Sequence, residues 1–120
     1  MFNLPDEESQ LRAAMNGKTW YIFKPAMAAR GETIKLIQRL TDENTSIATT
    51  VQEYMTDILL VDGHKFDLRV YFLVTSIDPF IVYMYPEGIG RVAAHLYEQP
   101  TPKNAKNLHI HLTNFAVNKD

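Results

Sequence analysis

Three alternating residues, Lys65, Asp67 and Arg69, carry the most chemistry in this sequence. They belong to residues 65–76, where apolar side chains alternate with charged or polar ones. In a strand the three would share one face, each roughly 6.6 Å from the next. Such a row can follow an extended anion such as a polyphosphate. The alternative is a solvated face with cross-strand ion pairs, which is the commoner use of surface charges.

Residues 80–85 favour the first of these interpretations. They are apolar at nearly every position, which predicts a strand that is covered on both faces. Charges beside such a strand would line a cleft. Asp78 and Pro79 predict a chain reversal. If the reversal centres on Ile77 and Asp78, hairpin register places Arg91 near the Lys65 end of the long strand. Two basic residues would then converge there, whereas the alternative is a solvated arginine at a strand end.

Lys24 follows a β-branched and aromatic run, residues 19–23, that predicts a strand. It precedes residues 26–33, which lack a periodic apolar pattern, contain Gly31 and predict a loop. A lysine beside a glycine-containing loop can clamp phosphate. The spacing matches neither the P-loop nor the glycine-rich loop of kinases, so the pattern alone does not identify a phosphate site.

Histidines are the other candidates for chemistry. His109 and His111 would lie on one side of an extended segment, as metal ligands can. The sequence has no cysteine and no His-Glu motif, and its other two histidines, His64 and His95, are scattered. We therefore predict no metal site among these residues.

The elements that must position these residues are mostly strands. Acidic residues followed by good helix formers in 6–15, with Gly17 after them, predict one short helix. Residues 34–40 fit either a helix or a strand, and residues 98–106 predict an exposed loop. Further short strands are predicted at 51–55 and 58–61, with a turn at 62–63. The pattern predicts an α+β domain, mainly an antiparallel sheet with few helices.

Composition narrows the class of protein. A chain of 120 residues predicts one domain. A net charge of −2 argues against a nucleic-acid binder that relies on bulk positive charge. No apolar run is long enough to span a bilayer, and the acidic start is unlike a signal peptide. We therefore expect a soluble intracellular protein without nucleic-acid or membrane partners.

Five strings, in this order, resemble signatures of the tubulin tyrosine ligase-like family. They are W-Y-I-F-K-P-A at 20–26, V-Q-E-Y-M at 51–55, K-F-D-L-R-V-Y at 65–71, E-G-I-G-R at 87–91, and H-L-T-N with a later N-K at 111–119. The resemblance runs from about Leu4 to the last residue and is nearest to the polyglutamylase type. It implies an ATP-grasp fold, of which residues 1–120 would form a partial domain with an incomplete core.

The resemblance also implies an activity. ATP would phosphorylate a glutamate carboxylate of tubulin, and the amine of an incoming amino acid, glutamate for a polyglutamylase, would attack the acyl phosphate. The implied partners are tubulin or microtubules, and the implied cofactors are ATP and magnesium. The implied location is the cytoplasmic cytoskeleton, with the cilium or basal body as one such place.

By motif position, the resemblance assigns roles to eleven residues. Two would bind phosphate and the substrate carboxylate or acyl phosphate as catalytic residues: Arg69 and Arg91. Six would bind nucleotide along the strands, with adenine held by Gln52 and the backbone that follows it: Lys24, Gln52, Glu53, Tyr54, Met55 and Lys65. Three more would complete or border the nucleotide site: Asp67, Thr113 and Asn114. His111 would lie at the same border, with Thr113 and Asn114 preferred to it as site residues.

Two departures from the family pattern qualify these expectations. Thr33 stands where the phosphate loop of the family has its second glycine, and threonine lacks the backbone freedom of glycine. The magnesium carboxylates of the family follow H-L-T-N, but Asp120 is the only acid after Asn114. We therefore expect the magnesium ligands outside this chain and no ligation by the chain alone. The alternative is a non-catalytic remnant that binds nucleotide or tubulin.

Overall fold

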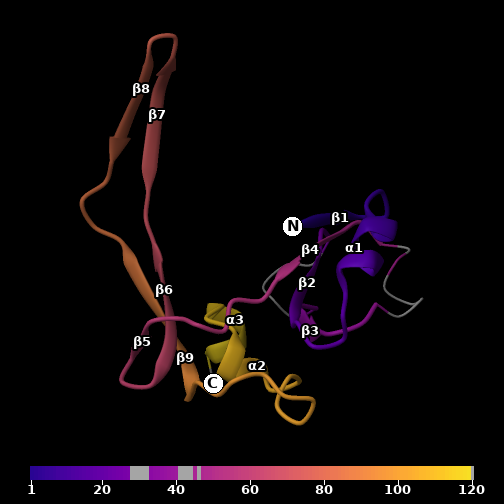
Figure 1. Ribbon diagram of the computed structural model, residues 1–120. Helices are drawn as coiled ribbons and strands as arrows, with labels where there is room; N and C mark the ends of the chain where they lie inside the picture. The colour runs from indigo at the N-terminus through magenta and orange to yellow at the C-terminus, as the bar shows by residue number, and fades with distance from the viewer. Residues whose placement is uncertain (28–32, 41–44, 46, 120) are drawn as a thin grey trace.

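The computed structural model describes residues 1–27, 33–40, 45 and 47–119 (Figure 1). One antiparallel sheet has the order β1-β4-β2-β3, and a second has the order β5-β6-β9. Two further strands, β7 (Phe72–Ile77) and β8 (Phe80–Met84), pair only with each other. The first sheet contains β1 (Phe2–Leu4), β2 (Tyr21–Pro25), β3 (Lys35–Ile37) and β4 (Thr49–Glu53). The second contains β5 (Leu60–Val61), β6 (His64–Arg69) and β9 (Ile89–Leu96). The helices are α1 (Glu8–Ala14), α2 (Leu108–His111) and α3 (Phe115–Asn118).

The prediction of a mainly antiparallel α+β chain with few helices is confirmed. The short helix predicted at 6–15 is α1, and the ambiguous segment 34–40 contains a strand, β3. Most of the loop predicted at 26–33 lies outside the described residues. The segment 98–106 is a loop as predicted, but two of its residues, Pro100 and Ala105, are buried. None of the described helices is long and apolar enough to cross a membrane.

Strand β2 is the centre of the core, because both of its faces are covered. Tyr21 and Phe23 point to a cluster that includes Leu11 of α1 and Val51 of β4. The residue between them, Ile22, points to the opposite cluster. That second cluster also contains Leu36, Tyr54, Ala105 and Leu112, so the C-terminal segment packs against the first sheet. The packing brings the end of β4 close to α2.

The second sheet begins with a tight hairpin. Asp62 and Gly63 have φ values of 49° and 78°, and they connect Val61 directly to its cross-strand partner His64. Positive φ at both central residues is the geometry of a two-residue hairpin turn, so the turn predicted at 62–63 is confirmed. At the other end of the sheet, a Cβ atom on Gly88 would lie 2.6 Å from the carbonyl oxygen of Arg69. Only glycine permits the chain to enter β9 so close to β6.

The prediction of one long strand over 65–76 is wrong, because the strand is divided at residues 70–71 into β6 and β7. The opposite chain explains the break. Residues 85–88 lie between β8 and β9 and include Pro86, which has no N–H to donate to a ladder. Pairing lapses there except for the amide of Tyr85, which donates to the carbonyl oxygen of Tyr71 at 2.9 Å.

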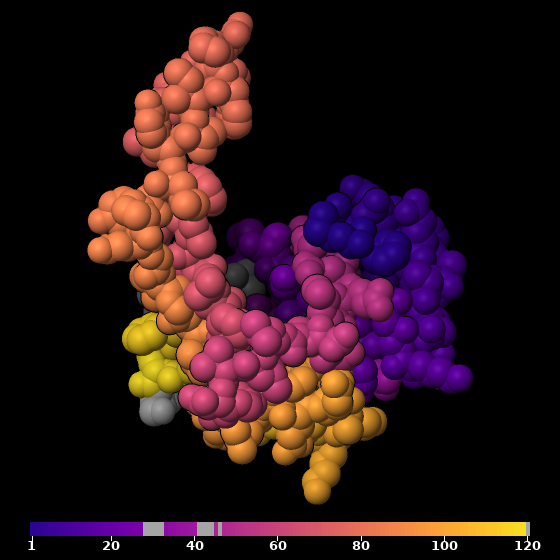
Figure 2. Space-filling view, turned by 60° about the vertical axis from the view of Figure 1, so that its left-hand side comes forward, coloured from indigo at the N-terminus to yellow at the C-terminus, as the bar shows by residue number. Residues whose placement is uncertain are grey.

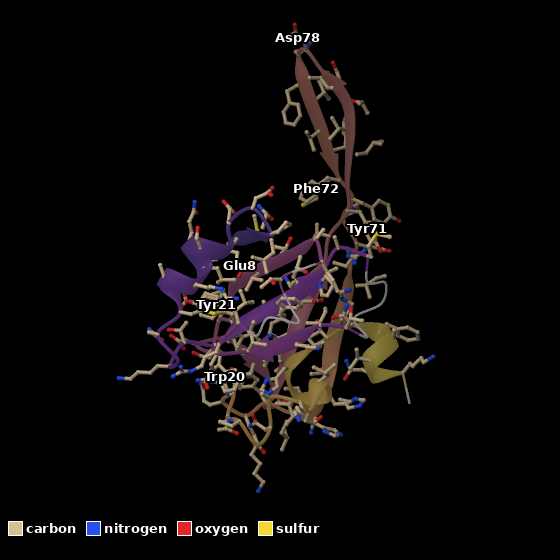
Figure 3. All side chains as sticks on the ribbon, turned by 90° about the vertical axis from the view of Figure 1, so that its right-hand side faces the viewer. Glu8, Trp20, Tyr21, Tyr71, Phe72 and Asp78 are labelled. Atoms are coloured by element: carbon tan, nitrogen blue, oxygen red, sulfur yellow. The ribbon has the colours of Figure 1, made fainter. Side chains whose placement is uncertain are left out.

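The prediction that residues 80–85 are covered on both faces is also wrong. Every residue of β8 is exposed, and so is nearly every residue of β7. The two strands form a ribbon that stands clear of both sheets (Figure 2), with Asp78 at its tip and Tyr71 and Phe72 at its base (Figure 3). The predicted reversal at Asp78 and Pro79 is confirmed. Apolar residues on both faces make a strand suited to burial, but they do not determine whether another segment packs against it.

Backbone amides of the β7–β8 ribbon are expected to exchange with deuterium at least ~100-fold faster than those of β2 and β4. A two-stranded ribbon without a packed face is marginally stable in water, whereas β2 lies between two apolar clusters. Exchange measured by mass spectrometry on the 120-residue chain, at several dilutions, tests this. Equal protection of ribbon and sheet at the lowest concentration would contradict it.

Candidate functional site

The centre of the site is an ion pair across the second sheet. Asp67 of β6 lies directly opposite Arg91 of β9. Arg91 donates from Nε to Oδ1 and from Nη2 to Oδ2 of Asp67, both at 2.6 Å, and the Thr113 hydroxyl donates to Oδ2 at 2.6 Å. These bonds lower the pKa of Asp67, with Arg91 the largest cause. The cross-strand ion pair of the alternative interpretation is therefore present, and Arg91 is not a solvated arginine at a strand end.

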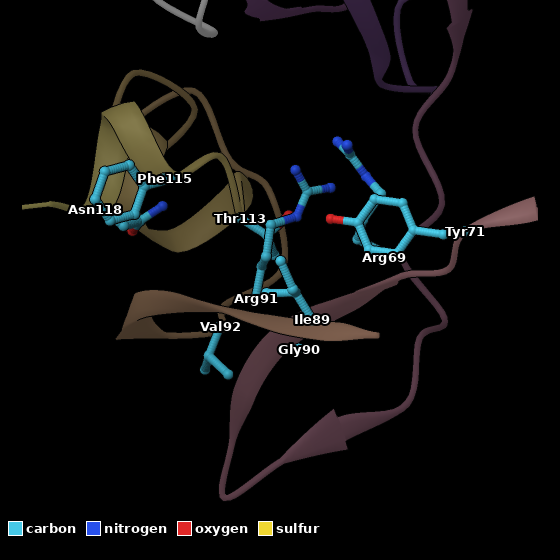
Figure 4. A pocket seen from close by; sticks show the side chains of 9 residues that line it. All are labelled: Arg69, Tyr71, Ile89, Gly90, Arg91, Val92, Thr113, Phe115 and Asn118. Atoms are coloured by element: carbon cyan, nitrogen blue, oxygen red, sulfur yellow. The ribbon is translucent and has the colours of Figure 1, made fainter. Parts of the chain in front are cut away.

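Beside this pair lies a pocket of about 410 Å³. The side chains of Arg69, Tyr71 and Arg91 point toward the same space from β6, the β6–β7 junction and β9 (Figure 4). Among the described residues, the Arg69 guanidinium has no hydrogen bond or ion pair, although its charge helps lower the pKa of Asp67. The C-terminal segment completes the lining with Thr113, Phe115 and Asn118. Two guanidinium groups therefore face one pocket, and one of them is held in place by a carboxylate.

Two lysines from different sheets form the second part of the site. Lys24 Nζ donates to Gln52 Oε1 at 3.1 Å, between the paired strands β2 and β4. Lys65 Nζ donates to the Tyr54 hydroxyl at 3.1 Å and lies 4.4 Å from the centre of that ring. Burial lowers the pKa of Lys65 to about 8; Asp67 opposes this shift and Lys24 adds to it. The two ammonium groups are therefore close enough to repel each other.

Lys65, Asp67 and Arg69 lie at alternate positions of β6 and act on each other electrostatically, which agrees with the predicted common face. The cleft was predicted because residues 80–85 were expected to form a covered strand, and that strand is exposed. Arg69 nevertheless lines a pocket, and Asp67 holds Arg91 at the edge of that pocket. Arg91 lies opposite Asp67, two residues from Lys65, close to where the hairpin register predicted it.

The remaining predicted site residues are not all brought together. Thr113 reaches the Asp67–Arg91 pair, but Asn114 lines a separate pocket with Phe115. Glu53 is exposed, and Met55 is 71% exposed. The amide of Tyr54 donates to the Trp20 carbonyl at 2.8 Å, so that amide is already occupied and is not available to adenine.

The prediction that His109 and His111 share one side of an extended segment is wrong. They lie in the short helix α2, where residues two apart point in nearly opposite directions. His111 is completely buried, whereas the His109 ring lies beside the His95 ring, with centroids 5.2 Å apart and the planes tilted by 35°. Within the described residues, no three His, Asp or Glu side chains lie close enough together to hold a metal ion.

Sequence reasoning missed one contributor to the site and ranked another too low. Tyr71 lies two residues after Arg69 and received no role, yet it lines the pocket. His111 is predicted only at the border of the nucleotide site, behind Thr113 and Asn114, yet its Nδ1 lies 3.3 Å from the Tyr54 hydroxyl. Nothing in the local pattern of α2 indicates that a histidine there contacts a residue 57 positions earlier.

Known proteins match this chain over nearly its whole length. The tubulin-tyrosine ligase family matches residues 1–120. Tubulin polyglutamylase ttll6 of Danio rerio is 40% identical over 118 residues, which cover 97% of this chain and 15% of that protein. Tubulin polyglutamylase TTLL7 of Mus musculus is 40% identical over 110 residues, which cover 92% of this chain and 12% of that protein. The chain therefore spans only a small part of the relatives that it matches. The match over its whole length shows that this chain belongs to the tubulin-tyrosine ligase family.

Proposed function

We propose that this chain is part of the ATP-grasp core of an ATP-dependent ligase that adds glutamate to glutamate side chains of tubulin. In this proposal residues 1–120 are a partial catalytic domain, and the protein acts on tubulin or microtubules in the cytoplasmic cytoskeleton. The observation that carries the proposal is the pair of subsites along β6. Two lysines that repel each other lie on one side of Asp67, and two arginines that face one pocket lie on the other.

The lysine side fits the polyphosphate of ATP. Lys24 and Lys65 are bonded to neutral partners, Gln52 and Tyr54, and neither makes an ion pair with a carboxylate among the described residues. Burial is the largest cause of the lowered pKa of Lys65, and the repulsion by Lys24 that adds to it would be relieved by an anion between the two ammonium groups. Family position supports adenine beside Gln52 and the peptide groups of Glu53 and Met55.

The arginine side fits a carboxylate or an acyl phosphate. A guanidinium presents several donors in a planar fork, and two donors of Arg91 are already taken by Asp67. Its remaining donors and those of Arg69 can meet an anion in the pocket. In an acyl-phosphate mechanism these groups would neutralise charge as phosphate leaves the tubulin carboxylate and the glutamate amine attacks.

The described residues offer no donor set for magnesium. Asp67 contacts two residues that line the pocket, and it is engaged by both of them, Arg91 and Thr113. The described residues therefore do not fit the usual carboxylate cluster for this ion. We derive no step through magnesium from them.

A chimera tests the proposed function. The segment of TTLL7 from Mus musculus that matches this chain would be replaced by the corresponding 110 residues. We expect the chimera to incorporate labelled glutamate into microtubules in the presence of ATP, because the exchanged segment would carry the nucleotide and carboxylate subsites. Parental TTLL7 serves as the positive control, and a Lys65→Met chimera should lose ATP binding and incorporation together.

Two other outcomes have separate meanings. A chimera that melts normally and binds ATP but incorporates no glutamate would overturn ligation and leave a nucleotide-binding remnant. A chimera that melts normally but binds no ATP would overturn the lysine subsite as well. Calorimetric ATP binding and thermal melting therefore accompany the glutamate assay.

A further inference from the structure

Three polar side chains from three separate elements meet behind the lysine subsite. Lys65 comes from β6, Tyr54 follows the end of β4, and His111 ends α2. Lys65 Nζ lies 3.1 Å from the Tyr54 hydroxyl oxygen, and His111 Nδ1 lies 3.3 Å from the same oxygen. The Tyr54 and His111 rings meet edge to face, with centroids 5.7 Å apart. The hydroxyl thus connects a buried imidazole to an ammonium group at the site.

The available donors fix the direction of one hydrogen bond and leave the other to the tautomer of His111. An ammonium group only donates, so the Tyr54 oxygen accepts from Lys65. Burial, followed by the charge of Lys65, lowers the pKa of His111 and favours a neutral ring. In the tautomer with its proton on Nε2, His111 Nδ1 accepts the hydroxyl proton of Tyr54. With that tautomer the chain of donors runs from Lys65 through Tyr54 to His111.

The surroundings of His111 argue against simple packing. The residue is completely buried, and its Nε2 has no hydrogen-bond partner of normal geometry among the described residues. The Asn104 backbone nevertheless lies close enough to favour a protonated ring. A buried nitrogen without a good partner destabilises the fold, which an apolar residue of similar size would avoid. The well-formed polar contact of this imidazole is the one to Tyr54.

Other charged or titratable groups surround the three residues. Asp67 and Lys24 act on Lys65 through their charges. Tyr97 donates its own proton to the Thr56 carbonyl at 3.2 Å, lies edge to face with His111, and is close enough to Tyr54 to be a second acceptor for its hydroxyl proton. Glu98 acts on His111 only through its charge. None of these groups replaces the Tyr54 hydroxyl as the acceptor for Lys65.

We propose that Tyr54 and His111 are positioning residues that hold the Lys65 ammonium where it meets the polyphosphate. This inference rests on the proposed function for the identity of the ligand, but the positioning itself is a property of the chain without ligand. His111 orients the Tyr54 hydroxyl, and the hydroxyl oxygen then fixes Lys65 Nζ. Helix α2 is thereby connected to the lysine subsite on β6.

The experiment compares four variants of the 120-residue chain. Tyr54→Phe keeps the ring but removes the acceptor for Lys65, and we expect it to weaken ATP binding by about tenfold. His111→Leu removes the acceptor for Tyr54 and should weaken binding by about threefold or more. His111→Asn can present an oxygen near the place of Nδ1 and should restore most of the affinity. Tyr21→Phe is the matched control, because Tyr21 and Tyr54 are each 5% exposed and the Tyr21 hydroxyl donates instead to the Ala14 carbonyl.

A second measurement, without ATP, separates this inference from the proposed function. The Cε signal of Lys65, identified by its loss in Lys65→Arg, is followed by NMR during a pH titration. Tyr54→Phe should lower the apparent pKa of Lys65, because the buried ammonium loses its acceptor. Tyr21→Phe and His111→Asn should leave the titration as it is in the wild type.

The outcomes are distinct. A shifted Lys65 titration in Tyr54→Phe, together with weak binding in His111→Leu that His111→Asn restores, would support the positioning role. A Lys65 titration that Tyr54→Phe leaves unchanged would overturn it, whatever the ATP affinity. Wild-type affinity in His111→Leu would overturn the part assigned to His111. If the wild type binds no ATP, the proposed function fails and the NMR titration still decides the positioning.

Discussion

Arg91→Lys in the TTLL7 chimera is expected to lower the rate of glutamate incorporation by about 100-fold. Arg91 uses Nε and Nη2 to hold both oxygens of Asp67, which aims its remaining donors at the pocket. A lysine keeps the charge but is a point donor, so it cannot bind Asp67 in this way and also face an anion. Arg69→Lys should reduce the rate as well, because the Arg69 guanidinium faces the same pocket.

Thermal melting separates a role in ligation from a role in folding. The Arg91 and Asp67 side chains are 30% and 37% exposed, so solvent screens their ion pair and its loss should cost less than about 1 kcal/mol. Arg69→Lys should not change the melting temperature. Arg12→Lys and Arg39→Lys are the controls for rate and melting, because both lie away from the pocket lining. The proposed role of Arg91 in binding the anion would be contradicted if the Arg91→Lys chimera ligates at the control rate. It would also be contradicted if the rate falls only because the variant melts early.

Short-range patterns were sufficient to predict the charged face of β6 and its partner on β9. Alternation places Lys65, Asp67 and Arg69 on one side, because side chains in any strand alternate between faces. A chain reversal at residues 78–79 brings Arg91 near this face, although its pairing with Asp67 rather than Lys65 also depends on the register shift in the ribbon and the break before β9. The two-residue turn at 62–63 is set by local backbone preferences. Each of these depends on residues near one another in sequence or on one hairpin.

The ribbon could not be predicted in the same way. The composition of β8 indicates a buried strand, but burial depends on which other segment packs against it, and none of the described residues does so. The division between β6 and β7 is visible only once Pro86 is known to lie across from residues 70–71. Apolar composition therefore predicted that these residues form a strand, but it did not predict that the strand is exposed.

The contacts that Tyr54 and His111 make in the site could not be predicted from local patterns either. Family resemblance pointed to the peptide groups of 53–55, yet the side chain of Tyr54 makes the contact to Lys65. His111 reaches that side chain only because α2 packs near the end of β4, with Tyr54 and Leu112 in one apolar cluster. Contacts between residues far apart in the chain depend on the packing of separate elements, which local patterns do not specify.

ATP binding by this chain is expected to weaken by about tenfold per pH unit above pH 8. In the chain without ligand, burial lowers the pKa of Lys65 from its ordinary value of 10.5 to about 8. A bound polyphosphate favours the ammonium form and raises that pKa, so binding above pH 8 requires Lys65 to take up a proton. Below pH 8 the ammonium form is already present and the affinity should be flat. Phosphate groups titrate near pH 6, below this window.

The stability of the ligand-free chain should change in the opposite direction over the same range. Because the folded pKa of Lys65 lies below its unfolded value, the unfolded chain binds this proton more tightly, and the free energy of unfolding rises as pH increases from about 8 toward 10.5. The pKa of Tyr54 is raised by burial, so its hydroxyl stays protonated throughout. Calorimetric ATP titrations and urea unfolding, both from about pH 7.5 to about pH 9.5, measure the two trends. In Lys65→Met ATP binding should be lost and the stability slope should vanish, while Lys18→Met, an exposed lysine, should keep both trends. An ATP affinity that is constant to pH 9.5 in the wild type would show that Lys65 does not gain a proton on binding, and the lysine subsite would have to be abandoned.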